Sequence, residues 1–397
     1  MILLSLPFII TLALTVLDVW LVEGSIVSVP LTRGQGVISH RNITSGSCRF
    51  VVLKEERNDL DFWFARFSIG ASRNLSILVD TGSTDLMLNP NVYQASEAAV
   101  ALSQPFSMRY GTVNSDGSGE ETVNGTVFQD IVSLENTNLS VPFQSFGVTA
   151  SVFPGSDPPF PHDGLMGFFV PGSAFGDGVP NWFSSLCAQE SIFDECRFGL
   201  ALKTSKDIGV LYLGGVERSC FTGELSAVAM HERFIFGDVV VGGKIIQPNA
   251  TIMIDSGTTV SWGPIELVKE VFDAAGIQSI YRHNNDTLTT TLDGIYPCDT
   301  PPLFGFGFPS ESDAFEARSA QSSAISHESS IFNIFPDALA EYSDGQGNCA
   351  ASIHGIDHEE DSWILGQGFF QGRYIDHNIR EHILGFADLL EEKIKII

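Results

Sequence analysis

The stretch Ile77-Leu78-Val79-Asp80-Thr81-Gly82-Ser83-Thr84 is matched, 175 residues further on, by Ile252-Met253-Ile254-Asp255-Ser256-Gly257-Thr258-Thr259. Each copy has three apolar residues, an Asp, a hydroxyl residue, a Gly and two more hydroxyl residues. Downstream, each half also has an apolar-apolar-Gly element, Leu165-Met166-Gly167 and Ile364-Leu365-Gly366. A single Asp-Thr-Gly or Asp-Ser-Gly triplet is common by chance, whereas two extended copies with matching partners are not. The repeat therefore predicts two related lobes.

The texture of the chain after residue 60 is that of a β protein. Short apolar runs, punctuated by Gly, Asn, Asp and Pro, cover residues 62–69, 75–79, 234–241 and 252–254. Helical periodicity is confined to 264–275 and 181–190. We expect an all-β fold of barrels or sandwiches, with an N-terminal lobe over 58–200 and a C-terminal lobe over 201–397.

The N-terminus is predicted to be a signal peptide, residues 1–24, because an uncharged apolar run is followed by small residues. The alternative, a membrane anchor, is disfavoured because the run is short for a span. No second stretch is long and apolar enough to span a bilayer, so no membrane anchor is expected in the mature chain. Residues 25–57 carry five basic and two acidic residues and precede a strongly acidic body. They are interpreted as a pro-segment covering a carboxylate-lined cleft, or as a plain N-terminal extension.

The formal net charge of −27 comes from 48 acidic and 21 basic residues. This balance disfavours nucleic acid and anionic membrane surfaces as partners. It fits a protein that works at low pH, where protonated carboxylates no longer repel one another, and it also fits a need for solubility alone.

Cysteines and glycosylation sequons both indicate export. Six cysteines without a C-x-x-C spacing favour disulfides over metal ligands. Six N-x-S/T sequons lie at Asn42, Asn74, Asn124, Asn138, Asn249 and Asn285. We expect a secreted, or a vacuolar or lysosomal, protein with no cofactor and no metal. His354 and His358 are four residues apart, but they lack a third ligand and are interpreted as solvated loop residues.

The two copies suit the chemistry of paired carboxylates. If the lobes face each other, Asp80 and Asp255 meet, share one proton and activate a water that attacks an amide without a covalent intermediate. Gly82 and Gly257 permit the turns, and Ser83 and Thr258 can donate hydrogen bonds to the carboxyls. Thr81 and Ser256 are expected to bond across the lobe interface. The alternative is that each Asp is a structural turn residue.

These signatures resemble those of the pepsin family of two-lobed aspartic endopeptidases, over about residues 60–390. Asp163-Gly164-Leu165-Met166-Gly167 and Trp363-Ile364-Leu365-Gly366 are similar to its paired apolar elements, and Val29-Pro30-Leu31-Thr32 to the start of its pro-segment. Leu211–Gly215 is similar to its interlobe strand and Leu384–Ala387 to its closing strand. The resemblance implies a bilobal all-β fold with a central cleft, synthesis as a zymogen, and a monomer that cuts protein or peptide substrates between hydrophobic residues.

The resemblance also assigns residues outside the two signatures. Tyr110 and Gly111 are similar to the tip of a flap that closes over substrate, and Thr259 is expected to contact substrate. Cys298 and Cys349 fall where the family has a disulfide, whereas Cys187 with Cys196 and Cys48 with Cys220 is one of several connectivities left open.

Three departures from the family pattern affect what the resemblance implies. Met87 stands where a Trp usually steadies the flap Tyr, and Gln367 replaces a common Asp. The flap region is enlarged and acidic, with Asp116, Glu120 and Glu121. The main rival hypothesis is a non-catalytic binding protein or inhibitor with the pepsin-like fold. It is disfavoured because both signatures are intact.

Overall fold

A computed structural model describes most of the two predicted lobes and one short segment before them. The described residues are 26–33, 62–111, 120–150, 159–169, 172–189, 192–203, 209–284, 289–308, 330–357 and 362–390. Several predicted features lie outside these ranges: the signal peptide, most of the basic arm, Cys48, Asn42, Asn285, Asp116 and His358.

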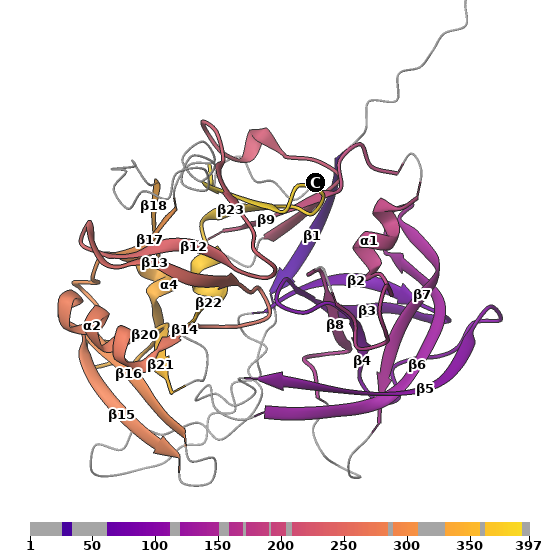
Figure 1. Ribbon diagram of the computed structural model, residues 1–397, viewed down its shortest axis with the longest axis horizontal. Helices are drawn as coiled ribbons and strands as arrows, with labels where there is room; N and C mark the ends of the chain where they lie inside the picture. The colour runs from indigo at the N-terminus through magenta and orange to yellow at the C-terminus, as the bar shows by residue number, and fades with distance from the viewer. Residues whose placement is uncertain are drawn as a thin grey trace, which may run out of the picture.

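The first lobe is built from one end of a 13-stranded sheet (Figure 1). Its strands, in spatial order, are β2 Trp63–Ile69, β3 Ser72–Asp80, β8 Gly164–Gly167, β4 Leu86–Leu88, β7 Ser140–Thr149, β6 Glu120–Leu134 and β5 Val100–Gly111. The antiparallel β5–β6 hairpin projects from this lobe toward the second lobe.

The second lobe contains an 11-stranded sheet. Its strands, in spatial order, are β18 Ser330–Asn333, β17 Phe304–Phe308, β12 Ile235–Val241, β13 Lys244–Ile254, β22 Ser362–Leu365, β14 Ser261–Pro264, β21 Ile353–Ile356, β16 Thr289–Pro297, β20 Asn348–Ala351 and β19 Ala340–Ser343. One further strand, β15 Gln278–Asn284, pairs with β16.

The two sheets repeat the same topology around the two sequence signatures. In the first lobe β3 runs parallel to β8, β8 is antiparallel to β4, and β4 is parallel to β7. In the second lobe β13, β22, β14 and β21 are paired in the same sequence of directions. The predicted apolar-apolar-Gly elements are β8 and the end of β22, each hydrogen-bonded to the strand that carries an Asp. The predicted bilobal all-β fold is confirmed.

Six strands join the lobes and continue the first sheet beyond β2. They are β11 Ser226–Ala229, β24 Ile383–Asp388, β23 Arg373–Asn378, β9 Arg197–Leu202, β10 Gly209–Leu213 and β1 Val27–Arg33. The lobe boundary expected between residues 200 and 201 falls inside β9. In β1, Val29 and Leu31 are buried, so this part of the basic arm is a strand of the sheet between β10 and β2.

Helices are short in the described ranges, as expected. The predicted helix over 264–275 is α2 Ile265–Ala275. The helix predicted over 181–190 is shorter, α1 Trp182–Cys187, with Asn181 as its N-cap; it ends at Cys187, which is bonded to Cys196. The others are α4 Pro336–Leu339, α5 Gln367–Phe370 and the 3₁₀ turn η2 Arg218–Cys220. Within the described residues no helix is long and apolar enough to span a membrane.

The cysteines are consistent with the predicted pairing as far as they are described. Cys298 is bonded to Cys349 and Cys187 to Cys196, with Cα–Cα distances of 5.1 and 5.4 Å. Cys220 is buried, and its thiol donates to the Tyr212 hydroxyl at 3.1 Å. Because Cys48 lies outside the described residues, its pairing with Cys220 stays a prediction.

Four of the six predicted glycosylation sites are described, and all four are exposed. They are Asn74, Asn124, Asn138 and Asn249. Two of them, Asn74 and Asn249, have positive φ angles of 57° and 52°, which Asn tolerates in tight turns. A glycan could be attached at these four positions without opening the core.

Candidate active site

The first signature ends β3 with a carboxyl that is almost completely buried. Asp80 is 6% exposed. Its Oδ1 accepts the backbone N–H of Gly82 at 2.8 Å, and its Oδ2 accepts the Ser83 hydroxyl at 2.5 Å. The backbone N–H of Phe168, just after β8, donates to the Asp80 carbonyl at 2.8 Å. Both carboxyl oxygens therefore have a donor that fixes their orientation.

The second signature has the same arrangement at the end of β13. Asp255 is 9% exposed, and its Oδ1 accepts the Gly257 N–H at 2.7 Å. Its Oδ2 accepts the Thr258 hydroxyl at 2.6 Å. The backbone N–H of Gln367 donates to the Thr258 carbonyl at 2.8 Å, as the N–H of Phe169 does to the Ser83 carbonyl at 2.9 Å in the first lobe. The donors expected at matching offsets are thus present in both lobes.

The two carboxyls face each other across the glycines of the opposite turns. A Cβ added to Gly82 would lie 2.4 Å from Cγ of Asp255. A Cβ added to Gly257 would lie 2.4 Å from Oδ1 of Asp80. Only glycine fits at these two positions, because any side chain would overlap the carboxyl of the other lobe. The structure therefore brings Asp80 and Asp255 together, as the repeat predicts.

Four hydrogen bonds between the lobes hold the two turns in register. Thr81 donates its hydroxyl to the Ile254 carbonyl at 3.0 Å and accepts the Ser256 N–H at 2.9 Å. Reciprocally, the Ser256 hydroxyl donates to the Val79 carbonyl at 2.7 Å and accepts the Thr81 N–H at 3.0 Å. Thr81 and Ser256 are both buried. Their predicted role in bonding across the interface agrees with this geometry.

The electrostatics of the pair favour one shared proton. Burial, and then the neighbouring Asp255 carboxyl, raise the pKa of Asp80 well above its ordinary value. The hydrogen bonds from Ser83 and Gly82 oppose this shift only in part. Two carboxyls this close do not both ionise readily, so one acid and one base are available at the same site.

Tyr110 lies at the end of β5, on the hairpin predicted to be the flap. Its ring packs edge-on against Phe160, with centroids 5.2 Å apart. Burial, followed by the nearby charges of Asp80 and Asp85, raises the pKa of its hydroxyl. The Tyr110 hydroxyl is thus near enough to Asp80 to be influenced by its charge. Gly111 ends the strand, and residues 112–119, which connect it to β6, lie outside the described part.

The surroundings of Tyr110 differ from the family pattern as the sequence indicated. Met87 is fully buried in an apolar cluster against which Tyr110 packs. The hydroxyl of Tyr110 is buried and has no hydrogen-bond partner among the described residues. The Tyr110 ring is therefore supported by apolar contacts, among them the edge-on contact with Phe160, which no sequence pattern predicted.

The sequence also gave no role to Asp85 and Gln367 beside the dyad. Asp85 accepts the Ser173 hydroxyl at 2.6 Å and the Ala174 N–H at 2.8 Å, so it ties a loop to the end of the first signature. The side-chain amide of Gln367 donates to the Ser256 carbonyl. Thr259 is half-buried, and its contact with substrate stays a prediction.

His354 corrects one prediction. It was expected to be a solvated loop residue, but it lies buried in β21, with Nδ1 3.0 Å from Asp293 and Nε2 3.1 Å from Glu341. Asp293 also pairs with Arg282, and Trp262 packs over the imidazole at 5.0 Å. Burial alone would lower the pKa of His354, but its two carboxylate partners raise it to about 9. The spacing of His354 and His358 gave no hint of partners so distant in sequence.

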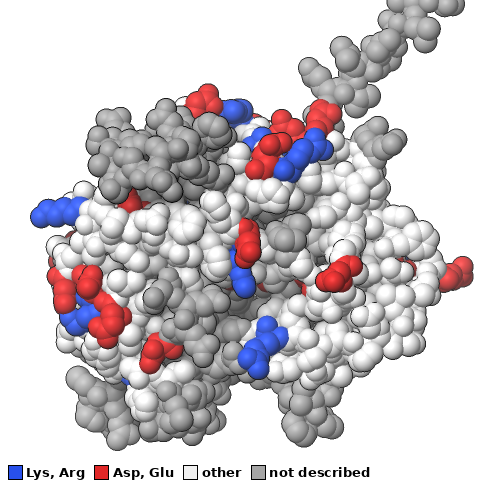
Figure 2. All heavy atoms as spheres, in the orientation of Figure 1, with Lys and Arg blue, Asp and Glu red and all other residues white. Residues whose placement is uncertain are grey.

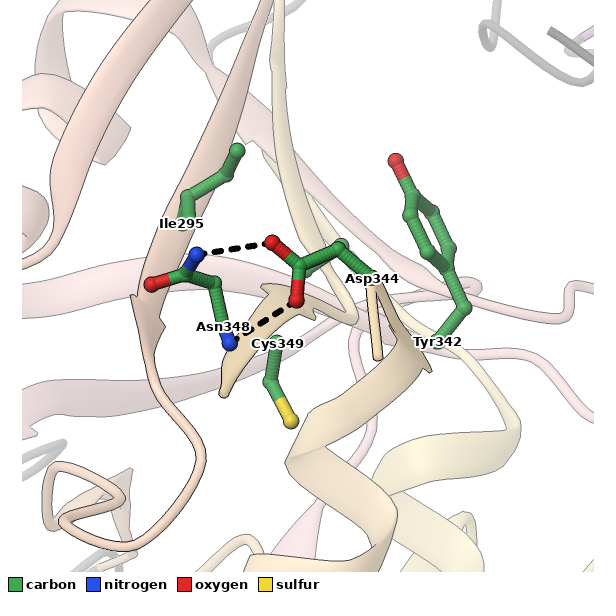
Figure 3. Close-up of a pocket in the computed structure, with 6 residues that line it drawn as sticks. Ile295, Tyr342, Asp344, Asn348 and Cys349 are labelled. Carbon is green, nitrogen blue, oxygen red and sulfur yellow. Dashed lines mark hydrogen bonds between the residues drawn. The ribbon is translucent and has the colours of Figure 1, made fainter. Parts of the chain in front are cut away.

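A small hollow beside the Cys298–Cys349 disulfide is too small to be the site (Figure 3). Its lining includes Asp344, whose carboxylate accepts the backbone and side-chain N–H groups of Asn348 at 3.0 and 2.7 Å. A volume of about 10 Å³ holds roughly one water. On the face drawn in Figure 2, the described Lys and Arg residues stand singly or in small groups, with no broad basic patch.

Comparison with known proteins agrees with this geometry. The family model for eukaryotic aspartyl proteases matches residues 62–389. The chain is 26% identical to "Secreted aspartyl protease 1" of Malassezia globosa, over 82% of this chain and 73% of that protein. It is 26% identical to gastricsin of Oryctolagus cuniculus, over 86% and 85% of the two chains. It is also 26% identical to cathepsin E of Mus musculus, over 93% and 95%.

The matched region contains both signatures, the β5–β6 hairpin and five of the six strands that join the lobes; β1 lies before it. It covers far more than half of the chain, and the two carboxyls that it contains lie close to each other. The chain therefore belongs to the eukaryotic aspartyl protease family and is an aspartic endopeptidase.

Proposed function

We propose that this protein hydrolyses internal peptide bonds in acidic compartments, with a water held between Asp80 and Asp255. The observation that supports this most directly is the paired turn geometry, in which each carboxyl has two donors and lies against the glycine of the other lobe. Thr81 and Ser256 fix that arrangement before substrate binds, which lowers the entropic cost of reaching the transition state.

The proposed reaction uses one protonated and one ionised carboxyl. The ionised carboxylate takes a proton from the water, whose oxygen forms a bond to the amide carbon. The protonated carboxyl gives its proton to the carbonyl oxygen. When the tetrahedral intermediate collapses, the carboxyl that took the water's proton gives it to the amine nitrogen as the C–N bond breaks. The other carboxylate takes a hydroxyl proton from the intermediate, so the dyad is again singly protonated.

Acid-dependent activity follows from the same proton. As pH rises, the pair loses its shared proton and with it the acid half of the mechanism. As pH falls far enough to protonate both carboxyls, the base half is lost. The acidic composition supports a working range on the acid side of neutrality.

Substrate preference is proposed to be hydrophobic. The flap residue Tyr110 packs against an apolar cluster that contains Phe106, Phe160 and Phe175. A substrate side chain that enters beside this cluster would leave water for an apolar surface. The protein is proposed to act as a monomer on protein or peptide substrates.

Export and control as a zymogen are proposed mainly from the residues that precede the first lobe. A leader over 1–24, the sequons and the secreted relative support the secretory pathway, to the exterior or to a vacuole or lysosome. Residues 25–57 are proposed to restrain the enzyme before maturation. Because β1 is a buried strand of the sheet, we expect the covering part of the arm to follow Arg33.

The test is cleavage of denatured haemoglobin or casein between about pH 2.5 and 7, with and without pepstatin. We expect acid-dependent cleavage that pepstatin blocks and that Asp80→Asn abolishes. Asp130→Asn is the matched control, because Asp130 is a buried carboxylate of the same lobe that bonds Tyr93 and Ser96 away from the dyad. No cleavage at any pH after removal of the arm would favour the rival, a non-catalytic binding protein.

A further inference from the structure

Asn89, the residue after β4, clamps a loop backbone of the first lobe. It is 2% exposed. Its Nδ2 donates to the carbonyls of Phe160 and His162 at 2.7 and 2.8 Å, and its Oδ1 accepts the Phe160 N–H at 3.0 Å. The backbone N–H of Asn89 also bonds the Asp163 carbonyl at 3.0 Å. A single side-chain amide therefore satisfies both backbone polar groups of Phe160.

Phe160 connects this clamp with the flap. Its side chain is 4% exposed and meets the ring of Tyr110 edge-on at 5.2 Å, with an interplanar angle of 78°. The Tyr110 hydroxyl has no partner among the described residues, so no hydrogen bond there fixes the position of the ring. Met87, at the base of the same cluster, has a thioether that offers no strong hydrogen-bonding group.

We propose that Asn89 is a positioning residue for catalysis, which holds Phe160 as the wall that places Tyr110 over the dyad. Asn89 follows the first catalytic turn by one short strand, so the clamp ties the support of the flap to the same segment that carries Asp80. The inference rests on the proposed peptidase activity and adds a residue that does not touch the reacting atoms.

An asparagine suits this role because it carries a donor and an acceptor in one planar group. Aspartate at position 89 would keep the bond from the Phe160 N–H and lose the bonds to the carbonyls of Phe160 and His162. Leucine, of similar size, would lose all three and leave the buried backbone groups of Phe160 unpaired. Either change frees the Phe160 backbone to move, and its ring with it.

The experiment measures kcat and KM for one peptide substrate at acidic pH, with active sites counted by pepstatin titration. We expect Asn89→Leu to lower kcat/KM per active site by about tenfold to a hundredfold, mainly in kcat. Asn89→Asp, which keeps one of the three bonds, should have a smaller effect in the same direction and covers the case in which Asn89→Leu does not fold. The pH values of half-maximal activity should stay unchanged, because the dyad is not altered.

Gln144→Leu is the matched control. Gln144 is also a buried amide of this lobe that holds a loop carbonyl, that of Pro180 at 3.0 Å, but it does not belong to the cluster around Tyr110. It should change kcat/KM per active site by less than about twofold. A loss of activity equal to that of Asn89→Leu would mean that any buried amide has this effect and would overturn the proposal.

A double-mutant cycle with Phe160→Leu tests the route through the ring. If Asn89 acts through Phe160, adding Asn89→Asp to Phe160→Leu should cost little further activity. Full additivity, or wild-type kcat/KM per active site in both Asn89 variants, would overturn the positioning role and leave the peptidase intact. An inactive wild-type protein would overturn the proposed function and this inference together.

Discussion

The two lobes have the same turn around their catalytic carboxyls, but the residues that pack against the turn differ between the lobes. In the first lobe, Met87 follows Asp80 at the position where Trp262 follows Asp255 in the second. Met87 is packed in an apolar cluster below the flap. Trp262 instead covers His354, which is paired with two carboxylates. One support is thus apolar and the other ionic.

This difference indicates that the chemistry constrains the groups that touch the carboxyls more strongly than it constrains the residues packed behind them, which we call the supporting layer. The groups that touch the carboxyls are the same type in both lobes, because each carboxyl needs a backbone N–H, a hydroxyl and space beside a glycine. The supporting layer only has to be closely packed, with its buried polar groups hydrogen-bonded, so its residues can differ between the two lobes. In the first lobe the filling also lies against Tyr110 of the β5–β6 hairpin, where apolar contacts leave no polar side chain of the cluster to be paired.

The largest effect is expected from the layer that the lobes share. Gly82→Ala and Gly257→Ala should each lower kcat/KM by about a hundredfold or more, because each added methyl would displace the carboxyl of the opposite lobe. Steady-state kinetics on folded protein, verified by thermal unfolding, measures this. Gly215→Ala is the control, since its methyl meets only the flexible end of Ile26. Unequal losses for Gly82 and Gly257 would break the symmetry argued above.

The second largest effect is expected from the four hydrogen bonds that Thr81 and Ser256 make between the two turns. Thr81→Val keeps the shape of the side chain but leaves the Ile254 carbonyl and the Ser256 N–H without their partner, so we expect a loss of about 4 kcal/mol in the free energy of unfolding. Denaturant unfolding measures it. The exchange of both residues, Thr81→Ser with Ser256→Thr, retains every hydroxyl and should cost much less. An equal cost would show that shape, rather than hydrogen bonding, maintains the register.

The sequence predicted the shared layer well because that layer is local. The positions of Asp80, Gly82 and Ser83 within one turn follow from adjacent residues, and their repetition 175 residues later made the pairing of the lobes predictable. The Cys298–Cys349 disulfide agrees with the pairing that the resemblance implied, and Cys187–Cys196 is one of the connectivities that had stayed open.

The supporting layer was not predictable, because its contacts join residues far apart in the chain. Asn89 lies 71 residues from Phe160, and His354 lies 61 residues from Asp293. A sequence pattern records neither which strands become neighbours nor which polar groups they bury together. Val27–Arg33 was likewise predicted to belong to an N-terminal arm, because the sequence does not show that this strand pairs with β10 and β2.

The contribution of His354 and its two carboxylate partners to the free energy of unfolding should depend on pH, whereas that of the apolar cluster around Met87 should not. The pKa of His354 is raised above the ordinary value of 6.5 to about 9, so its contribution is fully present below about pH 6.5 and is lost as pH rises through 9. His354→Gln should therefore lower the free energy of unfolding by about 2–3 kcal/mol near pH 5.5 and by much less above pH 9.5. Unfolding curves at both pH values test this, and a pH-independent loss would contradict the charge on His354.

The smallest effect is expected at Met87, and its size tests whether the apolar support is less specific than the ionic one. Met87→Leu conserves volume in a cluster with no polar demand on the side chain, so it should cost less than about 1.5 kcal/mol at any pH. The same unfolding measurements at pH 5.5 and 9.5 apply. A cost as large as that of His354→Gln at pH 5.5 would mean that the apolar support is as specific as the ionic one. The residues behind both carboxyls would then be as strongly constrained as the turns themselves.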